Sequence, residues 1–198
     1  MDLHIPPGAP PDLFITDALD ARPAGQPDFK REGRAIQQLA FQMADYPATV
    51  LPQFVDLALE ITGADSAGLS LWEPEPAPGV FRWHHLRGAL SQFSGATTPR
   101  NFSPCGITLD RNCPVLTLHP ERTYNWLVEA GVECPEVLLV PLYIGGDEPL
   151  GTLWVVARHE GQFTRDHARI LNTLAERVGD ALAAIDRQGR TVIPAREA

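Results

Sequence analysis

Apolar residues in the first part of the chain recur at helical spacing in two consecutive segments. Between residues 34 and 46 they fall on one helical face, and after Pro47 a second such segment covers residues 50–61. Gly63 follows the second segment, and glycine commonly ends a helix. The pattern therefore predicts two amphipathic helices with a short break between them.

The pattern then changes to the alternation and short apolar runs that are typical of strands. Residues 66–72 alternate between apolar and small polar side chains, and further strands are predicted over residues 80–86 and 114–118. Residues 136–158 form two apolar runs around Gly145-Gly146-Asp147-Glu148, a sequence that suits a tight turn. These runs predict an antiparallel hairpin near the end of the chain.

A long amphipathic helix is predicted from Thr164 to about Asp186, with Thr164 as its N-cap. Its apolar residues recur at intervals of three and four, which places them in one stripe: Leu171, Leu174, Val178, Ala181 and Ile185. Such a stripe either packs on the sheet or pairs with its copy in a dimer. Because only two heptads are clear, we favour packing on the sheet.

The segment between the two pairs of strands, residues 87–134, is less regular. It predicts a short helical piece at residues 89–93, a loop rich in proline and glycine through Gly106, and a helix over residues 120–130 after the strand at 114–118.

This order of elements resembles a GAF domain, a small-molecule sensor module related to PAS domains. The resemblance is strongest in Pro-Leu-Tyr-Ile-Gly-Gly-Asp-Glu-Pro-Leu-Gly-Thr-Leu-Trp, residues 141–154. It implies an α+β fold with a central antiparallel sheet of five to six strands. The N- and C-terminal helices are expected on one face of the sheet and a pocket segment on the other.

The resemblance also sets the expected domain boundaries. Residues 1–33 are a proline-rich arm, residues 34–187 are the domain, and residues 188–198 are a flexible tail. Prolines oppose a continuous helix or central strand in the arm. Within it, residues 13–16 are apolar enough to form an edge strand or a clasp on the domain.

Charge and composition exclude several classes of function. The net charge is −9, from 16 basic and 25 acidic side chains, and no basic cluster is present, so nucleic acid is not an expected partner. No apolar run is long enough for a membrane span, and the N-terminus has no secretory signal. Three cysteines, an odd and sparse set, suit reduced thiols in the cytoplasm.

Residues 97–106 look like the loop before the pocket helix in GAF domains that accompany bacterial sensor histidine kinases. The resemblance implies that Arg100, His119 and Arg122 converge on an anionic or carbonyl-bearing ligand between aromatic walls. The alternative is that the arginines form surface ion pairs and the aromatic residues are core. The candidate ligand-binding residues are Trp83, Arg100, Phe102, Ser103, Cys105, His119, Arg122, Tyr124, Trp126 and Trp154.

The cysteines raise the question of a covalent cofactor. Phytochrome-related GAF domains attach a linear tetrapyrrole to a Cys-His pair shortly before the strand that corresponds to residues 137–143. Here Cys105 is followed by Gly106, and Cys134 is followed by Pro135. No bilin is therefore expected, and the sequence leaves the cofactor unknown.

A catalytic thiol is the second possibility. Free methionine-(R)-sulfoxide reductase is a stand-alone GAF enzyme that also has a Cys-Gly before a helix and a second cysteine before the closing hairpin, as Cys105 and Cys134 do here. Its acidic residues in the last strand are missing from residues 153–156. A redox switch between Cys105 and either Cys113 or Cys134 is a further alternative, and inert buried thiols are the simplest one.

No metal motif is present. His84 and His85 are adjacent on a predicted strand and so point to opposite faces, and there is no Cys-x-x-Cys or His-Glu-x-x-His. Gly145-Gly146-Asp147-Glu148 resembles the hairpin signature of diguanylate cyclases, but any tight turn selects these residues.

The sequence therefore predicts a non-catalytic, cytoplasmic sensory or regulatory module of bacterial signal transduction. It is expected to bind an unidentified small molecule and to act on a partner such as a histidine kinase in a two-component system. The terminal helices are expected to be recognised either by that partner or by a second copy of the chain in a homodimer. The alternatives are a thiol enzyme resembling free methionine-(R)-sulfoxide reductase and an interaction domain without a ligand.

Overall fold

The computed structural model describes residues 8–23, 29–45 and 49–186. Within these ranges, six strands form one antiparallel sheet in the order β3-β2-β1-β6-β5-β4. The strands are β1 (Ser66–Glu73), β2 (Val80–Arg87), β3 (Thr97–Pro99), β4 (Val115–Leu118), β5 (Glu136–Ile144) and β6 (Glu148–Val156). The expected α+β fold with a central antiparallel sheet is confirmed.

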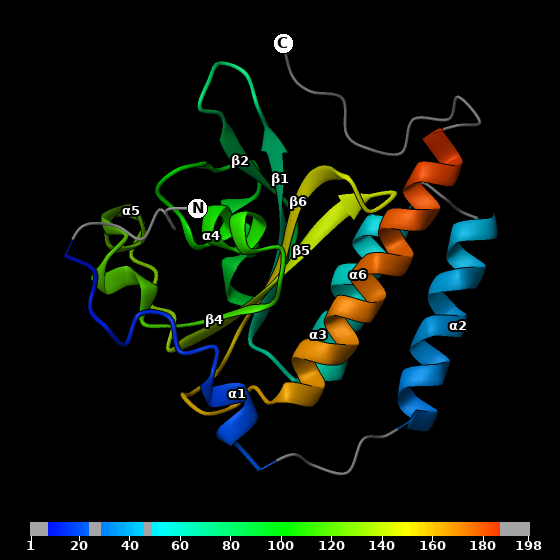
Figure 1. The fold of residues 1–198 in the computed structure, drawn as a ribbon, viewed down its shortest axis with the longest axis horizontal. Coiled ribbons are helices and arrows are strands. Elements are labelled where there is room, and N and C mark those ends of the chain that lie inside the picture. The colour runs from blue at the N-terminus through cyan, green and yellow to red at the C-terminus, as the bar shows by residue number, and fades with distance from the viewer. Residues whose placement is uncertain (1–7, 24–28, 46–48, 187–198) are drawn as a thin grey trace.

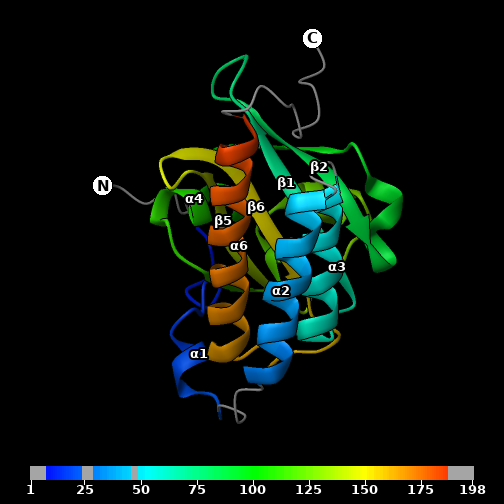
Figure 2. The same ribbon diagram turned by 90° about the vertical axis from the view of Figure 1, so that its right-hand side faces the viewer.

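Helices cover both faces of this sheet. The α-helices are α1 (Ala18–Ala21), α2 (Phe29–Asp45), α3 (Val50–Thr62), α4 (Pro104–Arg111), α5 (Asn125–Glu129) and α6 (Arg165–Asp186), and two 3₁₀ helices are η2 (Gly88–Phe93) and η3 (Pro120–Arg122). On one face α3 and α6 pack against the sheet and α2 lies outside them, while α4 and α5 lie on the other face (Figures 1 and 2). This arrangement is the one expected for the terminal helices and the pocket segment.

The sheet has a hydrophobic core on each of its two faces, and β5 contributes side chains to both. Leu138 and Val140 pack in the core beneath the long helices, whereas Val137 and Leu139 pack in the core on the opposite face. Successive strand residues point to opposite sides, so a strand that is buried on both faces is apolar throughout. Strand β5 therefore lies between the two cores and belongs to both.

The stripe on α6 packs within its own chain. Leu171, Leu174, Val178 and Ile185 are buried, and α6 lies along β5 (Figure 1). At Gly179 the helix approaches the strand so closely that a Cβ would overlap the carbonyl oxygen of Tyr143. Packing on the sheet, the favoured interpretation, therefore accounts for this stripe.

Gly145 and Gly146 form the turn between β5 and β6, with φ angles of 61° and 88°. Positive φ at both central residues is what a tight hairpin between twisted strands requires. The hairpin is placed where the sequence predicted it.

Part of the N-terminal arm lies along the edge of the sheet. Phe14 forms an antiparallel bridge with Thr117, and the amide of Ile15 donates to the carbonyl oxygen of Leu116 over 2.9 Å. Leu13 is buried beside β4. The arm thus covers an edge that would otherwise present unpaired backbone groups, as the clasp prediction required.

The helix after the arm begins at Phe29 rather than at Arg34, so it crosses the boundary expected at residues 33 and 34. Other parts of the predicted arm, residues 1–7 and 24–28, and the predicted tail lie outside the described residues.

The structure corrects the sequence prediction for the middle segment. Residues 104–111, expected to begin as a loop, form α4, in which the Ser103 hydroxyl accepts from the Gly106 amide over 3.3 Å and Pro104 occupies the first turn. The single helix expected over residues 120–130 is divided into η3 and α5. Tyr124 separates them because its backbone is extended while its side chain is fully buried.

Across the described ranges, no helix combines the length and the apolar character needed to cross a membrane.

Candidate functional site

A cavity of about 40 Å³ lies between the sheet and the segment that carries α4 and α5. By the space that a buried water needs, this is room for roughly three waters. The sheet supplies Ser70, Trp83, Val137, Leu139 and Trp154. The covering segment supplies Leu90, Cys105, Trp126, Leu127 and Cys134. The segment expected to form a pocket thus does so, and none of the described residues that line the cavity is charged.

Trp83 stands at the centre of the aromatic wall. Its ring centroid lies 5.3 Å from that of Trp154 and 6.1 Å from that of Trp126, in tilted and edge-to-face arrangements. Such arrangements are favourable for aromatic rings, whose edges and faces carry opposite partial charges. The structure therefore brings three of the predicted aromatic residues together at one cavity.

Tyr124 and Phe102 extend this aromatic cluster away from the cavity lining. Tyr124 is fully buried, with its ring 5.2 Å from Phe102 and 6.0 Å from Trp126. Burial raises the pKa of the Tyr124 hydroxyl, and the neighbouring Cys105 adds to this effect. The phenol therefore stays neutral at physiological pH.

Cys105, on α4, and Cys134, just before β5, both line the cavity as free buried thiols. Burial raises the pKa of Cys105, against the opposing effect of the nearby hydroxyl groups of Ser70 and Thr152. Burial, with the charge of Glu121, raises the pKa of Cys134 to about 12. Both thiols are therefore protonated near neutral pH, the form that is a poor nucleophile.

Cys113 is exposed and does not line this cavity. It is thus separated from the buried pair, and a redox role for any of the three cysteines stays a prediction.

Arg100 fastens α4 to the sheet instead of entering the cavity. Its Nη2 lies 2.6 Å from Asp110 Oδ1, its Nη1 donates to the Gly106 carbonyl oxygen over 3.1 Å, and its guanidinium lies 5.8 Å from the ring centres of Trp72 and Phe81. Ser103, another candidate, serves as the N-cap of α4.

His119 is held between two carboxylates. Its Nδ1 lies 2.8 Å from Glu121 and its Nε2 lies 2.8 Å from Glu160. The hydrogen bond with Glu160 is the main cause that raises the pKa of His119, and Glu121 contributes in the same direction. Arg122 is exposed on η3.

The expected convergence of Arg100, His119 and Arg122 is therefore corrected: the structure does not bring the three cations together at the cavity. Two of them are engaged by carboxylates of their own chain, and the third faces outward. Direct contact between any of the ten candidates and a ligand stays a prediction.

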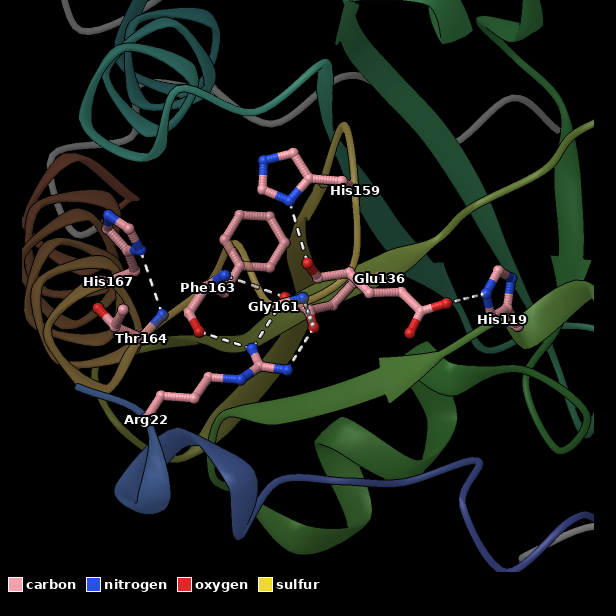
Figure 3. Close-up of polar contacts among 9 residues, drawn as sticks. Arg22, His119, Glu136, His159, Gly161, Phe163, Thr164 and His167 are labelled. Carbon is pink, nitrogen blue, oxygen red and sulfur yellow. Dashed lines mark hydrogen bonds and ion pairs between the residues drawn. The ribbon is translucent and has the colours of Figure 1, made fainter. Parts of the chain in front are cut away.

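Sequence reasoning missed a buried carboxylate, Glu136, at the start of β5. Its side chain is fully buried, and its oxygens lie 2.6 and 3.0 Å from the Arg22 guanidinium. They also accept from the backbone amides of Gly161 and Phe163, each over 3.0 Å (Figure 3). A charged residue that opens an apolar strand was the available signal, but its partner is 114 residues away.

The Arg22–Glu136 pair has a structural role. It ties the N-terminal arm to β5 and to the loop that leads into α6, where Arg22 also donates to the Phe163 carbonyl oxygen over 2.6 Å (Figure 3). No cluster of three or more potential metal ligands occurs in the parts of the chain that the structure describes.

A family model described as "GAF domain" matches residues 47–183. No curated protein matches the chain significantly. Among solved structures, the GAF domain of a phosphoenolpyruvate-protein phosphotransferase (ptsP) from Coxiella burnetii has a TM-score of 0.68 at 18% identity, over 82% of this chain and 98% of that one.

Two further structures show the range of proteins that share this fold. The GAF-B domain of DevS from Mycobacterium smegmatis has a TM-score of 0.57 at 22% identity, over 72% of this chain and 98% of that one. Free methionine-R-sulfoxide reductase from Neisseria meningitidis, in complex with its substrate, has a TM-score of 0.62 at 18% identity, over 85% of this chain and 96% of that one. At these identities the likeness concerns the fold alone.

Proposed function

The chain belongs to the GAF domain family, a family of sensory and regulatory modules, and from that membership we propose that it is a non-catalytic sensor that binds a small molecule in the Trp83 cavity. It acts in the cytoplasm in bacterial signal transduction. Occupancy of the cavity changes the position of the terminal helices, which a partner protein then recognises.

The observation that carries this proposal is the chemical character of the cavity. It is lined by aromatic and aliphatic side chains and by two protonated thiols, without a charged residue among the described lining. General acid–base and nucleophilic catalysis need a group that titrates near the working pH or is activated by a neighbouring base. An apolar enclosure with a few polar atoms is instead typical of a binding site.

The shared strand β5 gives a route from the cavity to α6. Val137 and Leu139 line the cavity, while Leu138, Val140 and Leu142 pack in the core beneath the long helices. A ligand that displaces the cavity face of this strand must also displace its other face, because a packed core does not yield locally. The terminal helix is therefore the element through which occupancy is communicated.

The outer faces of the terminal helices are the proposed contact surface for a partner such as a histidine kinase or for a second copy of the chain. The apolar stripe of α6 is already buried on β5, so a dimer has to use other residues. Phe41 on α2 is 70% exposed and lies on such an outer face. The sensory and regulatory character of the GAF family supports a place in signalling.

Native mass spectrometry of the freshly purified protein tests the proposal. The expected result is an extra mass that disappears when the protein is denatured, because the ligand is held without a covalent bond. An extra mass that survives denaturation would instead indicate attachment to a cysteine. The bare polypeptide mass, together with no ligand-dependent rise in the melting temperature across a metabolite panel, would favour an interaction domain without a ligand.

One observation favours a second candidate, a thiol oxidoreductase like the reductase from Neisseria meningitidis. Cys105 and Cys134 line the same cavity, as a reactive cysteine and its resolving partner would. Their raised pKa values weigh against it. The test is thiol-dependent turnover of free methionine sulfoxide, with Cys134→Ser as the inactive control and Cys113→Ser as the matched exposed control.

A further inference from the structure

His119 joins two segments that are far apart in the sequence. It lies directly before η3, whose Pro120 lines the cavity, and its Nδ1 lies 2.8 Å from Glu121 of that 3₁₀ helix. Its Nε2 lies 2.8 Å from Glu160, in the loop of residues 157–164 that leads from β6 into α6 (Figure 3). The imidazole therefore connects the segment that covers the cavity to the approach to the terminal helix.

Both contacts exist together only while the imidazole carries two N–H groups. An ionised carboxylate can only accept hydrogen bonds, whereas a neutral imidazole has one N–H and one acceptor nitrogen. Loss of a proton from His119 would place a lone pair of the ring against a carboxylate oxygen at 2.8 Å, so one of the two contacts has to break. The raised pKa of His119, of which the hydrogen bond with Glu160 is the main cause, agrees with this count of protons.

The contact with Glu160 is the one that breaks. The side chain of Glu121 is 14% exposed, and its Oε2 accepts from the amide of Cys134 over 3.3 Å, so it is held in place without the imidazole. The side chain of Glu160 is 59% exposed, so water can solvate it once it is released. The more buried carboxylate loses more when it gives up a hydrogen-bond donor, which keeps the remaining N–H on Glu121.

The other charged groups near these contacts do not replace the proton. They are Arg122 on η3, Glu133, Cys134 and Glu136 at the start of β5 and before it, and Arg158 and His159 in the loop that carries Glu160. Arg122 opposes the charge on the imidazole less strongly than either glutamate favours it. Glu136 is already paired with Arg22, and His159 contacts a backbone carbonyl oxygen.

We propose that Glu121, His119 and Glu160 form a proton-operated latch, which is closed while the imidazole is doubly protonated and opens at Glu160 when it becomes neutral. The proton is thus a second input, which does not depend on a ligand in the cavity. Opening separates the loop from η3, while the amides of Gly161 and Phe163 stay bound to the buried carboxylate at the start of β5. The approach to α6 is therefore fastened to the cover of the cavity only at the lower pH.

NMR spectroscopy of the ¹⁵N-labelled full chain tests the latch. The titration of His119 is followed at its ring protons, and the backbone order of residues 158–161 is measured by the heteronuclear NOE about one pH unit below and above the midpoint of that titration. Order in these residues should be lost above the midpoint. Their amide resonances should shift with the same midpoint as the ring protons.

Glu160→Gln separates the latch from a general effect of pH. The amide group of glutamine can donate to the neutral ring nitrogen, so the contact no longer needs the second proton. This variant should keep residues 158–161 ordered on both sides of the midpoint, and its His119 should release the proton at a lower pH than in wild type. Glu148→Gln removes the same charge from an exposed position in the β5–β6 hairpin and is the matched control, which should behave as wild type.

Backbone order that is the same on both sides of the midpoint in wild type would overturn the inference. The same pH dependence in Glu160→Gln as in wild type would also overturn it, because another group would then be responsible. His159 and His167 are unchanged in both variants, so they cannot cause a difference between them. None of these results bears on a ligand in the cavity, which native mass spectrometry tests separately.

Discussion

The phenolic hydroxyl of Tyr143, on β5, donates to the carbonyl oxygen of Leu109, on α4, over 3.0 Å. Cys105 on the same helix lines the cavity, and the backbone of Tyr143 is in close contact with Gly179 on α6. One residue thus touches both the helix that covers the cavity and the helix that ends the domain. This contact gives the proposed coupling a specific structural basis that mutation can test.

Tyr143→Phe should lower the free energy of unfolding by about 1 kcal/mol, because it removes a hydrogen bond and leaves the Leu109 carbonyl without this donor. Urea denaturation measures the change. Tyr124→Phe is the matched control: its hydroxyl is buried without a partner among the described residues, so its removal should be neutral or stabilising. Equal destabilisation by the two variants would contradict the assignment of the Tyr143 bond.

Gly179→Ala should destabilise the protein by about 2–3 kcal/mol, because its Cβ would overlap the Tyr143 carbonyl oxygen and force α6 away from β5. Gly33→Ala, in α2, is the control. Nothing lies within 4 Å of a Cβ at that position, so the higher helix propensity of alanine should stabilise the protein by about 0.5–1 kcal/mol. Thermal or chemical unfolding of the two variants should therefore give shifts of opposite sign, and shifts of the same sign would count against the close approach of α6.

Arg22→Met should cost about 3 kcal/mol of unfolding free energy, because it leaves the fully buried carboxylate of Glu136 without its counter-charge. Arg165→Met removes the exposed pair with Asp20 and should cost less than about 0.5 kcal/mol. Limited proteolysis should also cleave the N-terminal arm faster in Arg22→Met. If the two variants are equally stable, the arm is not anchored by this pair.

The stability contributed by His119 should depend on pH. Hydrogen bonds to Glu160 and Glu121 raise its pKa in the folded protein above the ordinary value of 6.5, so folding favours the protonated imidazole. Its contribution is fully present below the unfolded-state pKa and is lost as the pH rises through the folded-state pKa. His119→Asn, which tolerates the positive φ of 45° at this position, should therefore be more destabilising at about pH 6 than at about pH 8.

Urea denaturation of wild type and His119→Asn at both pH values measures this dependence. His85 titrates in the opposite sense, because burial, His84 and Arg87 lower its pKa. Its effect is common to both proteins and cancels in the difference. A difference in unfolding free energy that does not change with pH would show that the two carboxylates do not favour the charged form of His119.

The elements that sequence could predict are those whose signal is local. The stripe on α6 follows from helical period, and the hairpin follows from Gly145 and Gly146, whose positive φ angles the turn requires. The first turn of α4, residues 104–106, was predicted as the end of a loop, because Ser103 and Pro104 are common in turns as well as at helix N-termini. Local chemistry alone does not separate these two uses.

The candidate site was predicted only in part, because its aromatic residues have a local sequence signal and its charged residues do not. Trp83, Trp126 and Trp154 are large and apolar, so their burial on the pocket face follows from the order of the elements. The contact that a charged side chain makes depends on a partner that is distant in sequence. His119 reaches Glu160 across 41 residues, and the pairing of Arg22 with Glu136 has no sequence signature.

Hydrogen–deuterium exchange tests the central claim, which is that a ligand in the cavity changes the structure or stability of the terminal helix α6. The protein as isolated, with its cavity ligand, is compared with the same protein refolded without small molecules. The account predicts slower exchange in α4 and α5 and, together with it, altered exchange in β5 and α6, with the change in α6 reduced in Tyr143→Phe. Identical exchange in the two preparations, or a change confined to α4 and α5, would contradict it.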